Sequence, residues 1–239
     1  MSERPLVLSL FPGIGLLDMA FEEEGFCVVR GPDVLWGGDV HRFHPPAARF
    51  DGVIGGPPCK WWSSAANIAK ARGQNVQPDL IPEYIRVVQE AQPQWWVMEN
   101  VRGAPVPEIP GYRHHPQMLD AAAFGSIQRR VRRITFGTRD GTRLRPIPEA
   151  LTAVPYMGTV TTGQQRWDAL RQRPRSTASV ANYPDACEAQ GLPRDFLEDS
   201  PLTARGKYTV VANGVPLPMG RAIARAVKAA LGYDFQEAA

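Results

Sequence analysis

A cysteine follows a run of glycines and prolines directly after a short apolar stretch. Cys59 closes the sequence Gly55-Gly56-Pro57-Pro58-Cys59, just beyond Val53 and Ile54. The two prolines fix φ and remove backbone donors, which suits a loop that holds one side chain at a fixed angle. A thiol presented in this way is a candidate nucleophile. In isolation, the same motif could also hold a small buried thiol beside a proline turn.

A carboxyl group ends another strand-like stretch. Glu99 and Asn100 follow the apolar run Trp95-Trp96-Val97-Met98. Because the carboxyl ends of parallel strands share one edge of a sheet, Glu99 is expected to approach Cys59 and to face the same pocket. The alternative is that Glu99 only caps the turn that follows it.

Arginines cluster in the second half of the chain. In Gln128-x-Arg130-x-Arg132 the period-two spacing on a strand would place three side chains on one face, where guanidinium groups could hold a base carbonyl or a phosphate. A local basic surface indicates a polyanionic partner, although a solvated arginine-rich face explains the charge equally well. The other members of the cluster are Arg129, Arg133, Arg139, Arg143, Arg145, Arg166, Arg171, Arg173 and Arg175.

A glycine-rich turn, Phe11-Pro12-Gly13-Ile14-Gly15, precedes the first expected helix. Asp18 stands where a dinucleotide-binding loop would carry its third glycine, so the turn fits an adenosyl ligand without phosphates better than a pyrophosphate. Asp33 or Asp39 could accept hydrogen bonds from ribose hydroxyls or from the adenine amino group. A plain strand-to-helix turn and ordinary turn aspartates remain alternatives.

Strands and helices alternate along the chain and position these residues. This alternation predicts an α/β fold with a doubly wound, mainly parallel sheet. Little room remains for a full helix between the second strand and Cys59. We expect strands at 6–10, 26–30, 50–54 and 95–98, helices at 16–24 and 81–91, and a final strand, turn and helix from Tyr208 through Pro216 to Leu231.

The chain has 239 residues, 44% of them hydrophobic, and a net charge of +3. This length predicts one main domain, residues 1–137 plus 205–239, and a small inserted domain at 138–204, where the pattern weakens. The three cysteines are scattered and the four histidines lie far from them, so neither a disulfide framework nor a metal site is expected. The absence of long apolar runs and of a signal-type segment predicts a soluble, cytoplasmic protein.

Five segments occur in an order that resembles the ordered motifs of the DNA (cytosine-5)-methyltransferase family. They are 11–15, 55–59, 99–101, 128–132 and Ala212-Asn213-Gly214-Val215-Pro216. Residues 187–196 also resemble the segment that follows the family's target-recognition region. The resemblance therefore leaves only about residues 138–180 uncovered, and the inserted domain would be a small target-recognition domain.

The resemblance implies a reaction. The Cys59 thiolate would add to C6 of a cytosine flipped out of duplex DNA, and C5 would take a methyl group from S-adenosylmethionine. Glu99 would bind N3 and the exocyclic amine, and Arg132 with Arg130 would contact the base carbonyl or the adjacent backbone. Asn100 would brace the Pro57-Pro58 turn.

The resemblance also implies which residues hold the ligands. Cofactor contacts are expected at Phe11, Pro12, Gly13, Ile14, Gly15, Leu16, Asp33, Asp39, Val40, Pro58, Asn213, Gly214 and Val215. DNA contacts are expected at Lys60, Trp61, Trp62, Ser63, Gln128, Arg166, Arg171 and Arg173. The tryptophan pair could equally be core.

Three positions depart from the family pattern: Ser9 replaces a frequent acid, Leu16 a frequent glycine and Lys60 a common glutamine. They bear on cofactor affinity and DNA contact, and the small recognition region indicates a short or relaxed target sequence. We expect a metal-independent enzyme that acts as a monomer on double-stranded DNA. An RNA (transfer RNA) cytosine-5 methyltransferase and a catalytically silent DNA-binding protein remain alternatives, the latter disfavoured by the intact Cys59 and Glu99.

Overall fold

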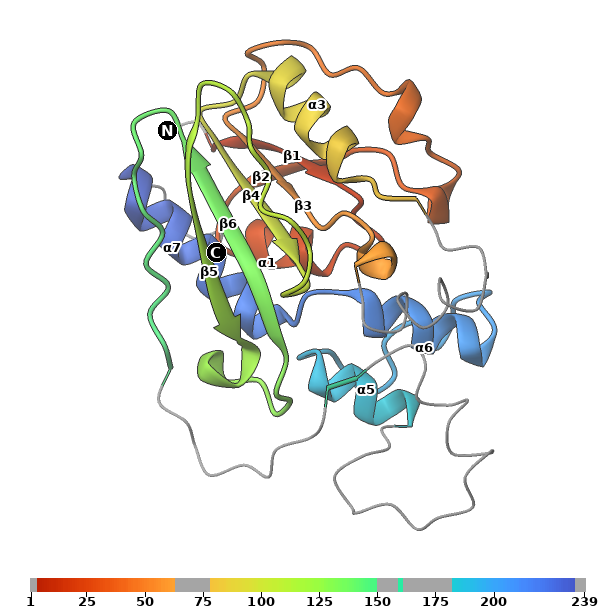
Figure 1. Ribbon diagram of the computed structural model, residues 1–239. Coiled ribbons are helices and arrows are strands. Elements are labelled where there is room, and N and C mark those ends of the chain that lie inside the picture. The colour runs from red at the N-terminus through yellow and green to blue at the C-terminus, as the bar shows by residue number, and fades with distance from the viewer. Residues whose placement is uncertain (1–3, 63–77, 150–158, 161–181, 235–239) are drawn as a thin grey trace.

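The structure is a computed structural model that describes residues 4–62, 78–149, 159–160 and 182–234. Within these ranges one six-stranded sheet has the order β2-β1-β3-β4-β6-β5 (Figure 1). Strands β2, β1, β3 and β4 run parallel to one another, and β6 runs antiparallel to both β4 and β5. The strands are β1 (Leu6–Leu10), β2 (Cys27–Arg30), β3 (Gly52–Gly55), β4 (Trp95–Asn100), β5 (Arg113–Asp120) and β6 (Val131–Thr138).

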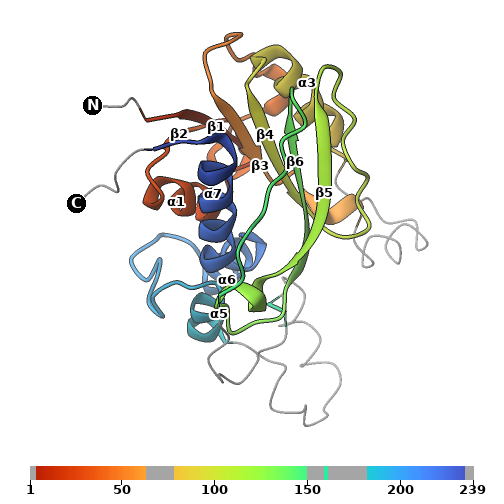
Figure 2. The same cartoon turned by 90° about the vertical axis from the view of Figure 1, so that its left-hand side faces the viewer.

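Helices cover both faces of this sheet. Figures 1 and 2 show α3 on one face and α1 with α7 on the other, which confirms the predicted doubly wound α/β architecture. Helices α5 and α6 pack against each other and against α1. The helices are α1 (Leu16–Glu23), α3 (Ile81–Ala91), α5 (Tyr183–Ala189), α6 (Ala204–Asn213) and α7 (Leu217–Leu231).

Two adjacent tryptophans on β4 link the sheet to the helical layers on its two faces. Trp95 and Trp96 are fully buried, and alternate side chains on a strand point to opposite faces. Trp95 stacks near Phe21 of α1, with ring centroids 6.2 Å apart, whereas Trp96 meets Tyr84 of α3 edge-on at 6.3 Å. The hydroxyl of Tyr84 donates to the carbonyl oxygen of Val97 at 2.8 Å.

Each tryptophan lies on a glycine of the neighbouring strand. Gly52 is the register partner of Trp95 and Gly137 the register partner of Trp96. A Cβ atom at either glycine would come within 2.2 Å of the indole ring. The absent side chains therefore make room for the two indole rings over the neighbouring strands.

The passage between β2 and β3 contains two short 3-10 turns, η1 (Val34–Trp36) and η2 (Val40–Arg42), and no α-helix. This agrees with the expectation that little room remained there for a full helix. A further turn, η3 (Cys59–Trp61), follows β3 and carries the predicted nucleophile.

The end of the chain differs from the prediction. The segment expected to be a strand at Tyr208 is helix α6. Tyr208, Val211 and Ala212 are spaced three and four residues apart, and all are buried in a cluster with Leu16 and Cys187. The local run of aromatic and β-branched residues favoured a strand, but packing against α1 and α5 stabilises the helix.

The inserted domain at 138–204 stays a proposal. The described part of it includes α5, whose residues Ala186, Cys187 and Ala189 share a buried cluster with Leu16 and Ala20 of α1. That end of the segment therefore packs on the main domain. Across the described ranges, no helix is long and apolar enough to cross a membrane, and no three His, Cys, Asp or Glu side chains gather as metal ligands.

We expect Gly137→Ala to lower the free energy of unfolding by about 2 kcal/mol or more, because the added methyl group would overlap the Trp96 ring. Urea denaturation followed by circular dichroism would measure the change. Gly206→Ala, in the first turns of α6 where the closest side-chain atom would lie 3.2 Å away, is the matched control and should be neutral or stabilising. Equal stability of the two variants would contradict the packing argument.

Candidate active site

Two loops and the last residues of β4 lie side by side at the carboxyl edge of the parallel strands. Leu10, Gly55 and Met98 are aligned across β1, β3 and β4 by their register. The glycine loop follows Leu10, the cysteine loop follows Gly55, and Glu99 follows Met98. The predicted convergence of these motifs is therefore a consequence of how the sheet is paired.

Glu99 lies against the cysteine loop and is held by an arginine. Its Oε1 atom is 3.0 Å from Nε of Arg132 on β6, and the two side chains are only 13% and 15% exposed. A Cβ atom at Gly56 would lie 3.1 Å from Oε2 of Glu99. The carboxylate is thus fixed between the backbone of Gly56 and the guanidinium group of Arg132.

Asn100 connects the end of β4 to the same loop. Its Nδ2 donates to the carbonyl oxygen of Pro57 at 3.2 Å, and its Oδ1 accepts from the backbone N–H of Val101 at 2.8 Å. The side chain is 1% exposed. This is the bracing contact that the sequence predicts for Asn100.

The environment of Cys59 acts on its thiol in two directions. Burial, and then the negative charge of Glu99, raise the pKa of Cys59 above its ordinary value. The positive charges of Arg132 and Arg130 act in the opposite direction. The thiol is therefore mostly protonated at neutral pH in the free protein, and the two guanidinium groups are the features that favour the thiolate.

Arg130 is almost fully buried behind this cluster. Its Nη1 donates to the carbonyl oxygen of Val160 at 3.0 Å. Burial, with repulsion from Arg132, lowers the pKa of Arg130 to about 10. Its Nε is buried and has no hydrogen-bond partner among the described residues.

The predicted DNA contact by Gln128 is wrong. Gln128 is fully buried, and it lies with Arg130 before β6 begins at Val131. Its Nε2 donates to the carbonyl oxygen of Ala189 at 2.6 Å and to the side chain of Gln190 at 3.0 Å. Gln128 therefore joins the start of β6 to the end of α5, where it cannot reach DNA.

The neighbouring arginines also have partners within the protein. Arg129 pairs with Asp120 at 3.3 Å, and Arg133 donates to the backbone carbonyl oxygens of Arg102 and Ala104. Arg133 thus supports the loop after β4, whereas Arg129 is 73% exposed and keeps its charge at the surface. Arg143 and Arg145 are exposed.

The glycine loop is held by the short passage that follows β2. The backbone N–H of Gly13 donates to Oδ2 of Asp33 at 2.9 Å, and Nε1 of Trp36 donates to the carbonyl oxygen of Gly13 at 2.7 Å. Gly13 has a φ of 57° and Gly15 a φ of 83°, conformations that favour glycine. A Cβ atom at Gly13 would meet nothing within 4 Å, so the loop presents bare backbone there.

Sequence reasoning missed Trp36 as part of this site. Its side chain is 68% exposed although its indole nitrogen is fixed to the loop. A lone aromatic residue in a passage rich in glycine and proline was the available indication. Asp33, predicted to bind ribose, accepts from the backbone N–H groups of Gly13 and Leu35, and its contact with ribose stays a prediction.

A buried carboxylate, that of Asp18, lies in the first turn of α1. Asp18 is fully buried, accepts from the hydroxyl of Ser9 at 2.5 Å and pairs with Nε of Arg30 at 3.1 Å. Burial raises the pKa of Asp18, whereas Ser9 and Arg30 act against that shift. A carboxylate at this helix N-terminus opposes the binding of a phosphate there, which agrees with a loop for a ligand without phosphates.

The segment 213–215 borders the glycine loop from the other side. A Cβ atom at Gly214 would lie 2.4 Å from Cδ1 of Leu16, and the backbone carbonyl of Gly214 accepts from Nε2 of Gln190 at 3.1 Å. Asn213 is exposed and Val215 is buried. Leu16, one of the departures from the family pattern, is therefore matched by a glycine opposite it.

The remaining predicted contacts are only partly described. Ser63, Arg166, Arg171 and Arg173 lie outside the described residues. Trp62 packs, partly buried, against the core on the α3 side of the sheet, which supports the core interpretation for that residue. Trp61 is partly exposed on the same turn. The backbone of Lys60 lies in η3 between Cys59 and Trp61.

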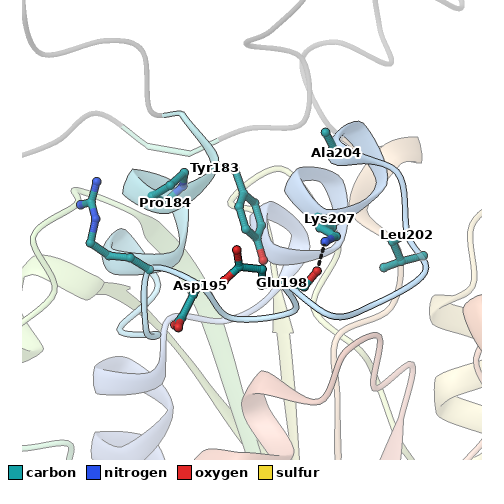
Figure 3. A pocket seen from close by; sticks show the side chains of 8 residues that line it. Tyr183, Pro184, Asp195, Glu198, Leu202, Ala204 and Lys207 are labelled. Atoms are coloured by element: carbon teal, nitrogen blue, oxygen red, sulfur yellow. Dashed lines mark hydrogen bonds between the residues drawn. The ribbon is translucent and has the colours of Figure 1, made fainter.

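A cavity of about 510 Å³ lies elsewhere, between α5, the segment after it and α6 (Figure 3). It is lined by Tyr183, Pro184, Arg194, Asp195, Glu198, Leu202, Ala204 and Lys207, none of which is a predicted site residue. Burial raises the pKa of Tyr183, so its hydroxyl stays protonated. In Figure 3 Lys207 reaches the backbone carbonyl oxygen of Glu198, 2.5 Å away.

The fold, with Cys59 after β3 and Glu99 near the end of β4, is that of an α/β methyltransferase. The profile of the family described as C-5 cytosine-specific DNA methylase matches residues 37–186, more than half of the chain. The chain therefore belongs to the C-5 cytosine-specific DNA methylase family, as the motifs predict.

Individual relatives agree with this assignment. The chain is 34% identical over 118 residues to the Type II methyltransferase M.NgoPII of Neisseria gonorrhoeae, covering 41% of this chain and 33% of that protein. It is 31% identical over 165 residues to the Type II methyltransferase M.FnuDI of Fusobacterium nucleatum, covering 56% and 46%. The chain thus spans less than half the length of either relative.

A solved structure shows the same fold over nearly the whole chain. It is a putative DNA modification methyltransferase encoded within an E. coli prophage, with a TM-score of 0.66 and 15% identity. The match covers 95% of this chain and 99% of that one.

The electrostatics of Cys59 predict a pH dependence. Because Glu99 raises the thiol pKa and Arg132 lowers it, Glu99→Gln should shift the pH midpoint of Cys59 alkylation downward and Arg132→Gln should shift it upward. Iodoacetamide modification between pH 6 and 10, read by mass spectrometry of the Cys59 peptide, would measure the midpoints. The exposed Cys27 in the same samples is the internal control. An upward shift in Glu99→Gln would refute the assignment.

Proposed function

We propose that this protein is a DNA (cytosine-5)-methyltransferase that transfers a methyl group from S-adenosylmethionine to C5 of a cytosine in double-stranded DNA. One observation carries the proposal. The glycine loop after β1, the loop with Cys59 after β3 and Glu99 near the end of β4 lie together at one edge of the sheet, where Arg132 pairs with Glu99. Membership of the C-5 cytosine-specific DNA methylase family supports it.

Cys59 supplies the covalent step. Its thiolate forms a bond to C6 of the cytosine, and the electron pair of the C5–C6 double bond becomes available at C5. When bound, S-adenosylmethionine supplies an electrophilic methyl group for that carbon. Loss of the C5 proton to a base then restores the double bond and expels the Cys59 thiolate. Arg132 and Arg130 favour the thiolate at the start and at the end of this cycle.

Glu99 recognises and activates the base. A carboxyl group fixed by Arg132 and lying against Gly56 is suited to hydrogen-bond N3 and the exocyclic amine of a cytosine held above Cys59. Transfer of a proton from the Glu99 carboxyl group to N3 neutralises the negative charge that develops on the ring after thiol addition. Arg130, whose charge also acts on Cys59, is proposed to contact the base carbonyl or the adjacent backbone.

The cofactor loop fits an adenosyl ligand. Bare backbone at Gly13, the exposed carboxylate of Asp39 and the exposed side chain of Asn213 supply polar contacts, while Val40 supplies an apolar one. The buried Asp18 disfavours phosphates at this place. We assign Asp33 to holding the loop through Gly13, and Trp36 to the rim of the site.

The substrate contacts follow from the chemistry. Neither C5 nor C6 can be reached inside a duplex, so the cytosine is flipped out at a cost of a few kcal/mol, which protein contacts offset. The residues proposed for these contacts are Lys60, Trp61, Ser63, Arg166, Arg171 and Arg173. We propose that the enzyme acts as a monomer in the cytoplasm without a metal.

The decisive test is transfer of labelled methyl groups from S-adenosylmethionine to mixed-sequence duplex DNA and to transfer RNA, with mapping of the methylated base. We expect 5-methylcytosine in DNA from the wild-type protein and none from Cys59→Ala. Calorimetry with S-adenosylhomocysteine should show that Cys59→Ala still binds the ligand. Label only in RNA would show that RNA, not DNA, is the substrate. Turnover by Cys59→Ala equal to that of the wild type would show that Cys59 is not the nucleophile.

Glu99→Gln should lower kcat at least about 100-fold, because the amide can neither carry the charge nor supply the proton that N3 requires. Steady-state kinetics with duplex DNA would measure it. Glu108→Gln is the matched control, since Glu108 is 84% exposed and pairs with His114 away from the site. A rate close to that of the wild type in Glu99→Gln would exclude the role at N3.

Gly214→Ala should weaken binding of S-adenosylhomocysteine about tenfold, because the new methyl group would displace Leu16 at the start of α1 or the turn that carries Asn213. Isothermal titration calorimetry would measure the loss. In the double variant Leu16→Ala with Gly214→Ala, the space is restored and most of the affinity should return. A double variant no better than Gly214→Ala would show that the two residues act independently.

A further inference from the structure

Arg86 on α3 reaches across to the segment that follows Asp39. Its Nη2 donates to the carbonyl oxygen of Val40 at 2.7 Å, and its Nη1 donates to that of Phe43 at 3.1 Å. The side chain is 27% exposed, so these hydrogen bonds are partly shielded from water. One planar group thus binds both ends of the short turn η2.

Two carboxylates on the same helix hold the guanidinium group in this orientation. Glu83 accepts from Nε of Arg86 at 2.8 Å, and Glu90 accepts from its Nη1 at 2.9 Å. The same carboxylates pair with the segment itself, Glu83 with His41 at 3.3 Å and Glu90 with His44 at 3.0 Å. The segment is therefore fastened to α3 through two backbone carbonyls and two imidazoles.

The segment from Asp39 to His44 carries two of the contacts proposed for the adenosyl ligand. Val40 is buried in the cluster that α3 forms with the sheet, and Asp39 precedes it with an exposed side chain. The Oδ1 atom of Asp39 accepts from the backbone N–H of His41 at 3.0 Å, which links the direction of that carboxylate to η2. The described passage between β2 and β3 contains no α-helix. Its contacts with α3 therefore determine where Asp39 and Val40 lie.

We propose that Arg86 is a positioning residue for the cofactor, which sets the place of Asp39 and Val40 by fastening η2 to α3. The inference rests on the proposed function, because it concerns the adenosyl ligand of that site. Arg86 itself touches neither the ligand nor the reacting atoms. Its effect is on affinity for the cofactor, whereas the chemistry at Cys59, on the far side of the glycine loop, is left to other residues.

A purely structural staple would behave differently. Loss of such a staple lowers stability and leaves the ligand affinity of the folded protein unchanged. Arg139 provides the comparison: it donates to the carbonyl oxygen of Gln92 and to the hydroxyl of Tyr112, both at 3.4 Å, and stacks 4.9 Å over the Tyr112 ring. It follows Thr138, which pairs with Trp95 at the opposite end of β4 from Glu99.

The experiment compares wild type, Arg86→Gln, Arg86→Lys and Arg139→Gln by calorimetry with S-adenosylhomocysteine, by thermal unfolding and by kinetics with duplex DNA. We expect Arg86→Gln to raise Kd for S-adenosylhomocysteine and KM for S-adenosylmethionine about tenfold, with kcat within about twofold of the wild type. Arg86→Lys keeps the charge but cannot donate to both carbonyls at once. Its Kd should therefore lie between those of the wild type and Arg86→Gln. Arg139→Gln should bind as the wild type does.

Wild-type affinity in Arg86→Gln would overturn the inference, and so would an equal loss in Arg139→Gln. If Arg86→Gln does not fold, the Arg86→Lys variant decides, and wild-type affinity there would overturn it. Absence of binding by the wild-type protein is a separate result: it would overturn the proposed function, and the inference would fall with it.

Discussion

Trp95 and Trp96 stand next to each other on β4 and point to opposite faces of the sheet, each against a glycine of an adjacent strand. Two large rings at the centre of a six-stranded sheet fill the space above Gly52 of β3 and Gly137 of β6. They also give α1 and α3 the aromatic surfaces on which these helices pack. The rest of the molecule depends on this arrangement, since it fixes both the sheet and its two helical layers.

The active-site geometry follows from the same strand. Two residues beyond Val97, β4 delivers Glu99 to Arg132 on one neighbour, and Asn100 to the cysteine loop on the other. Cys59, which follows β3, and Arg132 on β6 are therefore carried by the two strands whose glycines lie against the tryptophans. Side chains fixed in this way need little reorganisation when a ligand binds.

Sequence reasoning succeeded where a motif sits at the end of a parallel strand. Cys59 and Glu99 were placed correctly because the direction of the strands brings their ends together, whatever the distance along the chain. It failed where long-range packing decides. Tyr208 lies on a helix because its neighbours are α1 and α5, and Gln128 is buried because α5 offers it a backbone carbonyl. Neither partner can be recognised from the local pattern.

The tryptophan and glycine pairs also bear on how relatives of this protein can diverge. A ring and the space it fills are contributed by different strands, so neither can change alone without overlap or a cavity. Such positions should covary: a relative with a larger residue in place of Gly52 or Gly137 is expected to carry a smaller side chain opposite it. The centre of the sheet thereby links the histories of three segments that lie far apart in the chain.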